Sequence, residues 1–230
     1  MVALMVILTM LGFIAIDGIV QHVQAKRLAD VPAAERDQAP VAPVNLTTPG
    51  GIFLSPQHTW LQIRENGRVR VGMDGLIAGL LGRINGVTLA SKGSVVKAGQ
   101  PVCSVHLSGR KLDLVAPVAG IVKSVNPEVT EQPELALSRP YSGWLCELDA
   151  IDLGNEVKSL RIGEQALDWL RAEAQQVSEF LMRKSAPEPA LGLVLADGGI
   201  PRQGALETLE DADWHEFQNR FLAPEQKHRP

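Results

Sequence analysis

The sequence predicts a mainly β domain, a flattened barrel of two small sheets, to which several helices are appended. Three observations support this fold class. Between residues 60 and 148, short runs of alternating apolar and polar residues are separated by glycines, a pattern typical of many short strands. Over residues 160–184, apolar residues recur at intervals of three, four and seven, as in an amphipathic helix. The first 16 residues carry no charge, which indicates a membrane-spanning helix.

Size, composition and charge restrict the classes of function. At 230 residues the chain is long enough to bury a core, and its 45% hydrophobic and 21% charged residues are typical of a globular protein. The net charge of −4 and the single tyrosine give no basis for a nucleic-acid partner. Cys103 and Cys146 each lie within an apolar run, so we expect buried free thiols, although an oxidising compartment would also allow a disulfide between them.

Residues 1–22 are expected to form a transmembrane anchor. The apolar stretch of residues 1–20, whose one charge is Asp17, has nearly the length that spans a bilayer. A cleaved signal peptide is the alternative: residues 23–25 resemble a cleavage site, but the basic start of a signal peptide is missing. Because the basic residues 26 and 27 follow the segment directly, the positive-inside rule places the rest of the chain in the cytoplasm, behind a single-pass anchor.

The remaining chain divides into three parts. Residues 23–53 are rich in proline and alanine and are expected to be a linker between the membrane and a folded domain. Residues 54–185 contain the strand pattern and the long helix, and residues 186–230 form a small C-terminal extension.

Within the β region the expected strands follow one another closely. Residues 61–63 and 69–71 alternate apolar with polar side chains and predict a hairpin that turns at Glu65-Asn66-Gly67. Further strands are expected at residues 101–107, 111–115, 120–125 and 144–148. The long helix is expected to pack on the domain through the apolar stripe Leu160, Leu167, Leu170, Ala174, Val177 and Leu181.

A short helix is expected in the C-terminal extension, around Asp211 to Leu222. Trp214, Phe217 and Phe221 fall on one side of it. Packing against the core is the ordinary role of such a stripe, and a docking face for a protein partner is the alternative.

The most informative stretch combines glycine turns with core valines. It reads Gly93-Ser94-x-Val96-x-x-Gly99-x-x-Val102, and after a hairpin it continues as Ala116-Pro117-Val118-Ala119-Gly120-x-Val122. Gly93 and Gly99 bracket a tight turn in which glycine tolerates a positive φ at little cost. The valines are expected to fill the core between the two sheets, and the repeated strand–turn–strand units indicate an internal quasi-symmetry.

Together with several dispersed segments, this motif resembles the lipoyl and biotinyl domains, which share a β-hammerhead fold, and most closely the H protein of the glycine cleavage system. The segments are His58-Thr59-Trp60, Val71-Gly72, Leu81-Gly82, Asn126-Pro127-Glu128 and Pro140-Tyr141-Ser142-Gly143-Trp144-Leu145. The last of them is one residue shorter than the family's own segment. Residues 1–50 and 186–230 have no counterpart in the resemblance.

The resemblance implies a lysine at the hairpin tip, eight residues before the proline of the second corner, which lipoate amidates to form a swinging arm. Counting eight residues back from Pro117 gives Gly109, which has no amine. Ser108, Gly109 and Arg110 are therefore expected at the tip, and the nearest amine belongs to Lys111 in the outgoing strand. The ordinary role of both Lys111 and Arg110 is that of a solvated strand residue.

Two further places related to the arm differ from the family pattern. The acidic residue before the tip is replaced by His106, which is expected to be a surface residue rather than a metal ligand, because no second ligand lies at a suitable spacing. The segment that borders the arm's groove in the family reads Asp74-Gly75-Leu76-Ile77 here. Because the sequence also shows no phosphate loop, catalytic triad or paired carboxylates, we expect neither a bound metal nor an enzyme activity.

We therefore expect a membrane-anchored scaffold or adaptor of the H-protein kind, without lipoate, that has protein partners in a membrane-associated complex. A genuine lipoyl carrier, modified at Lys111, is the alternative. A third class, the periplasmic adaptors of efflux pumps, also combines an N-terminal membrane segment with a lipoyl-type domain. Those proteins insert a long coiled coil at the hairpin tip, where this chain has the four-residue turn Leu107-Ser108-Gly109-Arg110.

Overall fold

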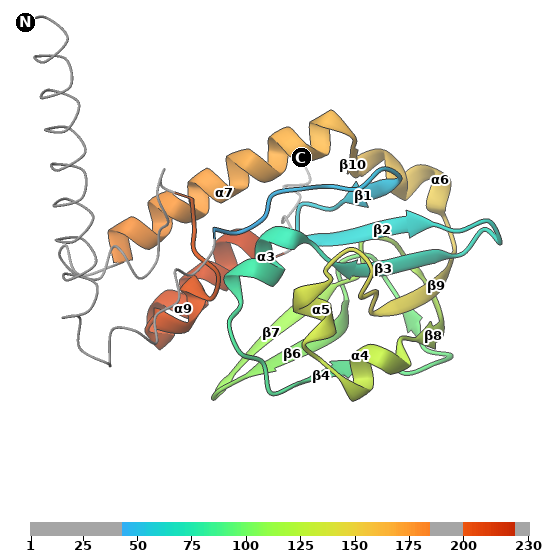
Figure 1. Ribbon diagram of the computed structural model, residues 1–230. Helices are drawn as coiled ribbons and strands as arrows, with labels where there is room; N and C mark the ends of the chain where they lie inside the picture. The colour runs from blue at the N-terminus through green and yellow to red at the C-terminus, as the bar shows by residue number, and fades with distance from the viewer. Residues whose placement is uncertain (1–42, 185–199, 224–230) are drawn as a thin grey trace, which may run out of the picture. The chain divides into compact units, whose positions relative to one another are not determined.

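Residues 43–184 and 200–223 are described by a computed structural model (Figure 1). The anchor predicted for residues 1–22 and the linker as far as residue 42 lie outside these ranges. Within them, no helix combines the length and the apolar character that crossing a bilayer requires.

In the described ranges, ten strands form two antiparallel sheets, which confirms the mainly β fold class. The larger sheet has, in spatial order, β10 (Arg161–Ile162), β1 (Ile52–Leu54), β2 (Thr59–Ile63), β3 (Val69–Met73), β9 (Cys146–Ala150), β8 (Gly120–Val125) and β5 (Val95–Val96). The smaller sheet consists of β4 (Gly86–Leu89), β6 (Pro101–Leu107) and β7 (Arg110–Val115).

Helices connect and cover the sheets. The α-helices are α3 (Gly75–Leu80), α4 (Pro127–Glu131), α5 (Leu135–Ser138), α6 (Leu153–Glu156), α7 (Glu164–Lys184) and α9 (Asp211–Phe217). The other helical segments are the 3-10 helices η1 (Val157–Ser159) and η3 (Ala205–Thr208) and the π-helix η4 (Gln218–Leu222). Figure 1 shows α7 running along one side of the domain, with α9 next to it and near the β6–β7 hairpin.

The predicted strands agree closely with the structure. The hairpin of β2 and β3 turns at residues 64–68, where Gly67 has a φ of 77°. β6 and β8 have the predicted bounds, β7 starts one residue earlier, and β9 starts two residues later. Gly93 and Gly99 both have the expected positive φ.

The long helix begins four residues after its predicted start. Arg161 and Ile162 pair with β1 as strand β10, and Gly163 follows with a φ of 62°, so α7 begins at Glu164. Leu160 therefore does not belong to the helix. The remainder of the predicted stripe is largely correct, because Leu170, Ala174, Val177 and Leu181 are buried.

The predicted linker was too long at its C-terminal end. Val44 is buried in the core, and its amide donates to the Pro201 carbonyl at 3.0 Å. Ile52 and Phe53 belong to β1, which pairs with both β2 and β10. The last part of residues 23–53 thus belongs to the folded domain. A strand as short as the three residues of β1 is stable here because it pairs with a neighbouring strand on each side.

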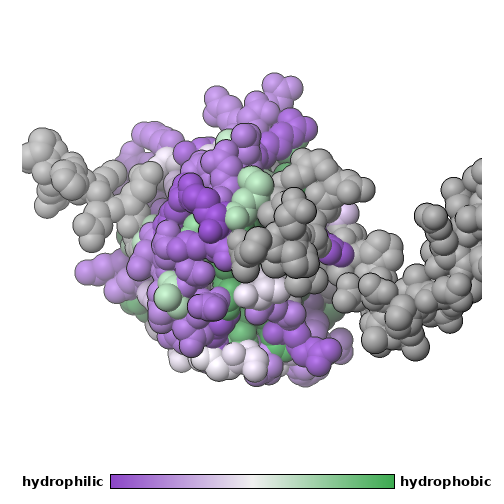
Figure 2. Space-filling view, turned by 90° about the vertical axis from the view of Figure 1, so that its left-hand side faces the viewer, coloured by the Kyte–Doolittle hydropathy of each residue, from purple (hydrophilic) through white to green (hydrophobic). Residues whose placement is uncertain are grey.

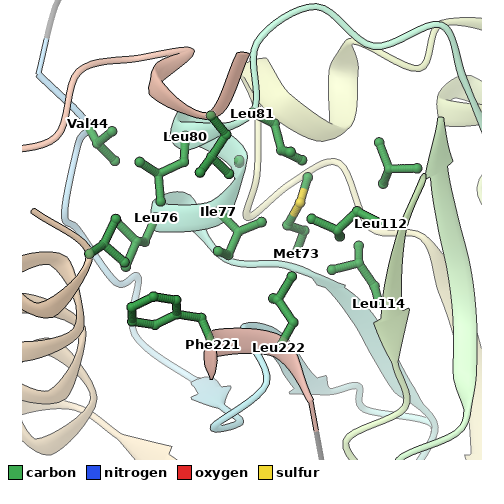
Figure 3. Packing of buried hydrophobic residues seen from close by; sticks show 14 of the residues in the cluster. Val44, Met73, Leu76, Ile77, Leu80, Leu81, Leu112, Leu114, Phe221 and Leu222 are labelled. Carbon is green, nitrogen blue, oxygen red and sulfur yellow. The ribbon is translucent and has the colours of Figure 1, made fainter. Parts of the chain in front are cut away.

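The C-terminal extension is not a separate module within the described residues. We call residues 200–223 the strap. Its apolar side chains share one buried cluster with α3 and β7, and Figure 3 shows Phe221 and Leu222 in the same core as Ile77 and Leu112. The predicted division between residues 54–185 and 186–230 is therefore wrong for the strap, which completes the core of the domain.

The aromatic residues of the strap face inward. Trp214, Phe217 and Phe221 are buried, and Phe221 contacts Phe180 of α7 edge to face, with ring centroids 5.8 Å apart. Core packing, the first interpretation of this stripe, is confirmed, whereas a docking face would need exposed rings. Figure 2 shows a face of the molecule that is mainly hydrophilic, with apolar residues in small areas.

Candidate functional site

The tip of the β6–β7 hairpin is a two-residue turn. Leu107 pairs with Arg110, so Ser108 and Gly109 form the turn, and Gly109 has a φ of 72°. A Cβ atom at Gly109 would meet no atom within 4 Å. The apex predicted by counting back from Pro117 is therefore correct, and it offers open space and no amine.

Lys111 lies in strand β7, as expected. Its side chain is 55% exposed, and its Nζ is 3.0 Å from Asp113 Oδ2 on the same strand. Its main-chain carbonyl accepts a hydrogen bond from Gln218 Nε2 at 2.8 Å. Lipoate, which the family attaches through a lysine amide, therefore has no attachment point at the apex. The nearest amine, that of Lys111, is already in an ion pair with Asp113.

Arg110 is not the solvated strand residue that the sequence suggested. Its Nε donates to Asp211 Oδ1 at 2.9 Å, and its Nη2 donates to the Leu209 carbonyl at 2.5 Å. The guanidinium also lies over the Trp214 ring, 5.5 Å from the centroid. One side of the tip is thus bound to the strap, and no sequence signal links residues separated by about a hundred positions.

An open groove of about 980 Å³ lies between the tip and the strap. Arg83 and Asn85 border it on one side, Leu107 to Arg110 form the hairpin side, and Leu206, Glu207, Asp211 and Trp214 form the strap side. The Arg83 amide donates to Glu207 Oε1, which holds the strap against the loop that follows α3. The groove is therefore built jointly by the family-like domain and the strap.

His106 is a hydrogen-bonded surface residue, as predicted. Its Nε2 lies 2.7 Å from Thr88 Oγ1 on the neighbouring strand. Beside it, the Ser104 hydroxyl donates to Asp113 Oδ1. Across residues 43–184 and 200–223, no three His, Cys, Asp or Glu side chains are grouped in a way that could hold a metal ion.

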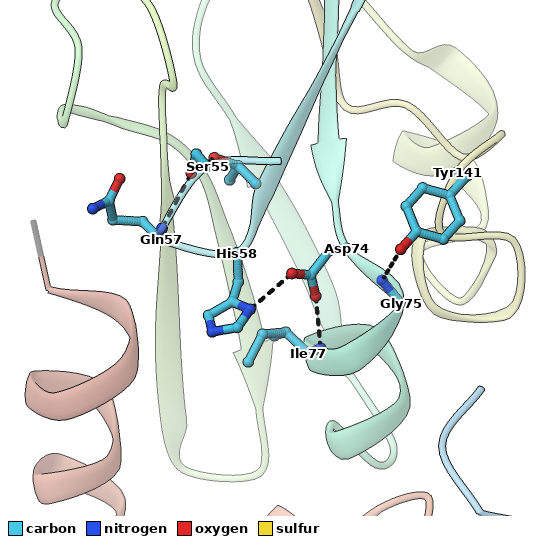
Figure 4. Close-up of polar contacts among 8 residues, drawn as sticks. Ser55, Gln57, His58, Asp74, Gly75, Ile77 and Tyr141 are labelled. Carbon is cyan, nitrogen blue, oxygen red and sulfur yellow. Dashed lines mark hydrogen bonds and ion pairs between the residues drawn. The ribbon is translucent and has the colours of Figure 1, made fainter. Parts of the chain in front are cut away.

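A second polar site, which we did not predict from the sequence, lies at the N-terminal end of α3 (Figure 4). His58 Nδ1 is 2.7 Å from Asp74 Oδ2, and both side chains are fully buried. The other oxygen of Asp74 accepts from the Ile77 amide, so Asp74 is the N-cap of α3. Tyr141 accepts a hydrogen bond from the Gly75 amide, and burial, together with the charge of Asp74, raises the pKa of Tyr141.

The residues that carried the family resemblance therefore build this corner of the fold. Trp60 donates its indole N–H to the Pro140 carbonyl at 2.8 Å, and a Cβ atom at Gly72 would collide with the Trp60 ring. His58, Trp60 and Gly72 are thus structural residues. Asp74 had a sequence signal as well, since an aspartate directly before an apolar run is typical of an N-cap.

Both cysteines are free and buried, as expected. Burial raises the pKa of the Cys103 thiol, and that of the Cys146 thiol, to about 12. A neutral buried thiol is a poor nucleophile and a poor metal ligand. The described part of the chain therefore presents no reactive cysteine.

Comparisons with known proteins agree on one family. The model of the glycine cleavage H-protein family matches residues 53–173. A probable glycine cleavage system H protein of Pyrococcus abyssi is 32% identical over 53% of this chain and 91% of its own length. The H protein of Bacillus cereus strain B4264 is 32% identical over 52% of this chain and 94% of its own length.

A crystal structure of the H protein of Mycobacterium marinum is also similar, with 26% identity and a TM-score of 0.46 over 53% of this chain and 98% of that one. The strap and the C-terminal half of α7 lie beyond the residues that the family model matches. Because that match covers more than half of the sequence, this chain belongs to the glycine cleavage H-protein family.

Proposed function

We propose that this chain is a member of the H-protein family without lipoate, which acts as a non-catalytic scaffold or adaptor in a membrane-associated complex. The observation that carries the proposal is Gly109 at the apex of the β6–β7 hairpin. An acyl group is attached through an amine, and glycine has none. The protein therefore keeps the body of an arm carrier while the attachment point is missing.

The surroundings of the apex support the same conclusion. Here Arg110 joins the tip to the strap through Leu209, Asp211 and Trp214. The tip is therefore part of a composite surface that suits contact with another protein.

The proposed location follows from the N-terminal sequence. Residues 1–20 have nearly the length and the apolar character of a single-pass anchor, and the basic residues 26 and 27 favour a cytoplasmic domain. A chain without residues 1–22 is expected to move from the membrane fraction to the soluble fraction. If it stayed with the membrane at the same level, these residues would not be the anchor.

Carriage of lipoate on Lys111 is the second candidate function. The observation in its favour is the amine of Lys111, which is 55% exposed two residues from the apex. Against it, Lys111 is within the strand and forms an ion pair with Asp113.

The intact mass of the full-length protein, purified from its native membranes, tests the absence of lipoate. We expect the mass of the unmodified polypeptide. Lys123→Ala is the matched control for Lys111→Ala, because Lys123 is also a strand lysine that pairs with an aspartate, Asp149, at 3.2 Å. A lipoyl or octanoyl adduct that disappears in Lys111→Ala and persists in Lys123→Ala would establish the carrier function instead.

The adaptor role is tested by solubilising the membranes in mild detergent. We expect the chain to migrate in a complex with other proteins at a fixed stoichiometry. Migration as an isolated chain under all solubilising conditions would contradict this role.

A further inference from the structure

A row of polar side chains crosses the outer face of the larger sheet. Gln62 on β2 is paired with Arg70 on β3, and Arg70 is paired in turn with Glu147 on β9. Residues that are paired in an antiparallel sheet place their side chains on the same face, so these three lie side by side. The alternate residues of the same strands, such as Leu61 and Val71, are buried on the opposite face.

Two more arginines continue this face towards the end of the β2–β3 hairpin. The Arg64 amide donates to the Arg68 carbonyl at 2.8 Å, so these two residues are opposite each other. By the alternation of a strand, both share the face of Arg70. Like charges that are directly opposite each other destabilise a sheet, so the three arginines are gathered here at a cost in stability. In Figure 1 this hairpin extends beyond the neighbouring strands, away from α9.

One carboxylate lies among the three guanidinium groups. Glu147 Oε1 is 3.2 Å from Arg68 Nη1, and Glu147 Oε2 is 3.7 Å from Arg70 Nε, which is longer than a hydrogen bond. Arg64 is exposed, and its Nη1 contacts Gln62 Oε1 at 3.5 Å. Among the described residues Arg64 forms no ion pair, so Glu147 neutralises the cluster only in part.

The surplus of positive charge remains when the neighbouring charged residues are included. Glu65, in the turn of the hairpin, is exposed and brings a second carboxylate. On the adjacent strands, Lys123 and Asp149 form a balanced ion pair at 3.2 Å. Three arginines therefore meet two carboxylates on this face, although the net charge of the whole chain is −4.

Arg70 is held in place by an aromatic ring. Its Cζ lies 4.6 Å from the centroid of Trp144, which packs against the main core cluster. The Arg70 side chain is still 30% exposed. A guanidinium that already rests on a ring loses little further freedom when it binds a ligand, so the residue suits recognition of an anion.

We propose that Arg64, Arg68 and Arg70, which we call the arginine face, dock an extended acidic segment of a protein partner. Carboxylates at alternate positions of an extended chain are about 6–7 Å apart, and Arg68 and Arg70 have the same spacing on β3. Each guanidinium can hold one carboxylate through two parallel hydrogen bonds. The inference rests on the proposed adaptor function and adds the chemistry of the partner to it.

Fluorescence anisotropy of a labelled peptide of alternating glutamate and serine, titrated with the full-length chain in one detergent, tests the arginine face. Arg64→Thr should bind the peptide roughly fivefold more weakly, the scale of one exposed ion pair. Arg64→Glu should lose roughly tenfold or more, because the charge is reversed. The urea midpoint of Arg64→Thr should not fall, since a like-charge pair is removed and threonine suits a strand. Weaker binding is then not a result of unfolding.

The matched control is Arg171→Ala, which removes an exposed arginine on α7 that pairs with Asp168. It should bind the alternating peptide as the unmodified chain does. A peptide with the same number of glutamates at every third position should bind roughly threefold more weakly, because its neighbouring carboxylates point to opposite sides of an extended chain. A lysine–serine peptide should not bind.

Unchanged affinity in Arg64→Glu, an equal loss in Arg171→Ala, or equal binding of the lysine peptide would overturn the arginine face as a docking site. Displacement of the glutamate peptide by inorganic phosphate, but not by chloride of the same ionic strength, would assign the arginines to a phosphate group instead of an acidic protein segment. These results are independent of the adduct test. A lipoyl adduct would overturn the proposed function, whereas an unresponsive arginine face would overturn only this inference.

Discussion

Replacement of His58 by alanine removes the side-chain partner of a carboxylate oxygen that has no access to solvent. Asp74 Oδ2 faces His58 Nδ1 at 2.7 Å, while Asp74 Oδ1 accepts from the Ile77 amide. Both side chains are 0% exposed, so water cannot take the place of the imidazole without opening the structure. The variant therefore leaves one carboxylate oxygen buried without its side-chain partner at the start of α3.

We expect His58→Ala to lower the free energy of unfolding by a large fraction of its total value. Removal of one partner from a buried pair costs about 3–5 kcal/mol in free energy of unfolding, out of a total of about 5–15 kcal/mol. The imidazole also packs on Trp169, with ring centroids 5.1 Å apart, and this contact is lost as well. Asp74→Asn keeps an oxygen for the Ile77 amide and carries no charge, so we expect it to cost roughly 1–2 kcal/mol.

Urea denaturation followed by circular dichroism, in one detergent for all variants, measures these differences. His58 has a φ of 60°, so His58→Asn is a useful companion, because asparagine adopts this conformation more readily than alanine. Addition of Asp74→Asn to His58→Ala should recover part of the loss, since the unpaired charge is removed. A loss of less than about 1 kcal/mol in His58→Ala, or no recovery in the double variant, would show that the buried pair does not stabilise this corner.

Three further predictions concern packing and pH. Gly72→Ala should lower the free energy of unfolding by more than ~2 kcal/mol, because its Cβ would collide with the Trp60 ring; near-native stability in urea denaturation would contradict the observed close approach. Trp214→Ala should cost about 3–5 kcal/mol by the same measurement, as expected for a buried aromatic residue, and a loss below ~1 kcal/mol would mean that the strap is not part of the core. Because burial raises the thiol pKa values of Cys103 and Cys146 from 9.0 to about 12, the unfolded chain loses these protons first as pH rises above 9. The free energy of unfolding should therefore fall towards pH 12 by up to ~1.4 kcal/mol per pH unit and thiol, and a double alanine variant should show a flatter decline.

The strands could be predicted because their signals are local. The alternation of apolar and polar residues correctly predicted the bounds of β6 and β8. The two short alternating runs on either side of Gly67 predicted the turn between β2 and β3. The apex at Gly109 was predicted from the family resemblance. The family resemblance places the attachment residue eight residues before the proline of the second corner, and counting back from Pro117 gives Gly109, which lies in the turn.

The missed features depend on contacts between distant residues. β1 has three residues and is preceded by the glycines 50 and 51, so it becomes a strand only through β2 and β10. The contact between Arg110 and Asp211 joins positions about a hundred residues apart, and neither residue type predicts it. The start of α7 was misplaced because the apolar period continued through Leu160, whereas Gly163 and the pairing of β10 determine where the helix begins.

The absence of an amine at the apex is not imposed by packing. A side chain at Gly109 would extend into open space, and an L-residue at a φ of 72° costs about 1–2 kcal/mol, which a domain of ordinary stability tolerates. The fold would therefore accept a lysine at this position. Beside the apex, the Arg110 side chain binds the strap of the same chain through Asp211 and Trp214. Because the fold does not require glycine here, we infer that the missing amine reflects the use of the tip, which under the proposed adaptor function is contact with another protein.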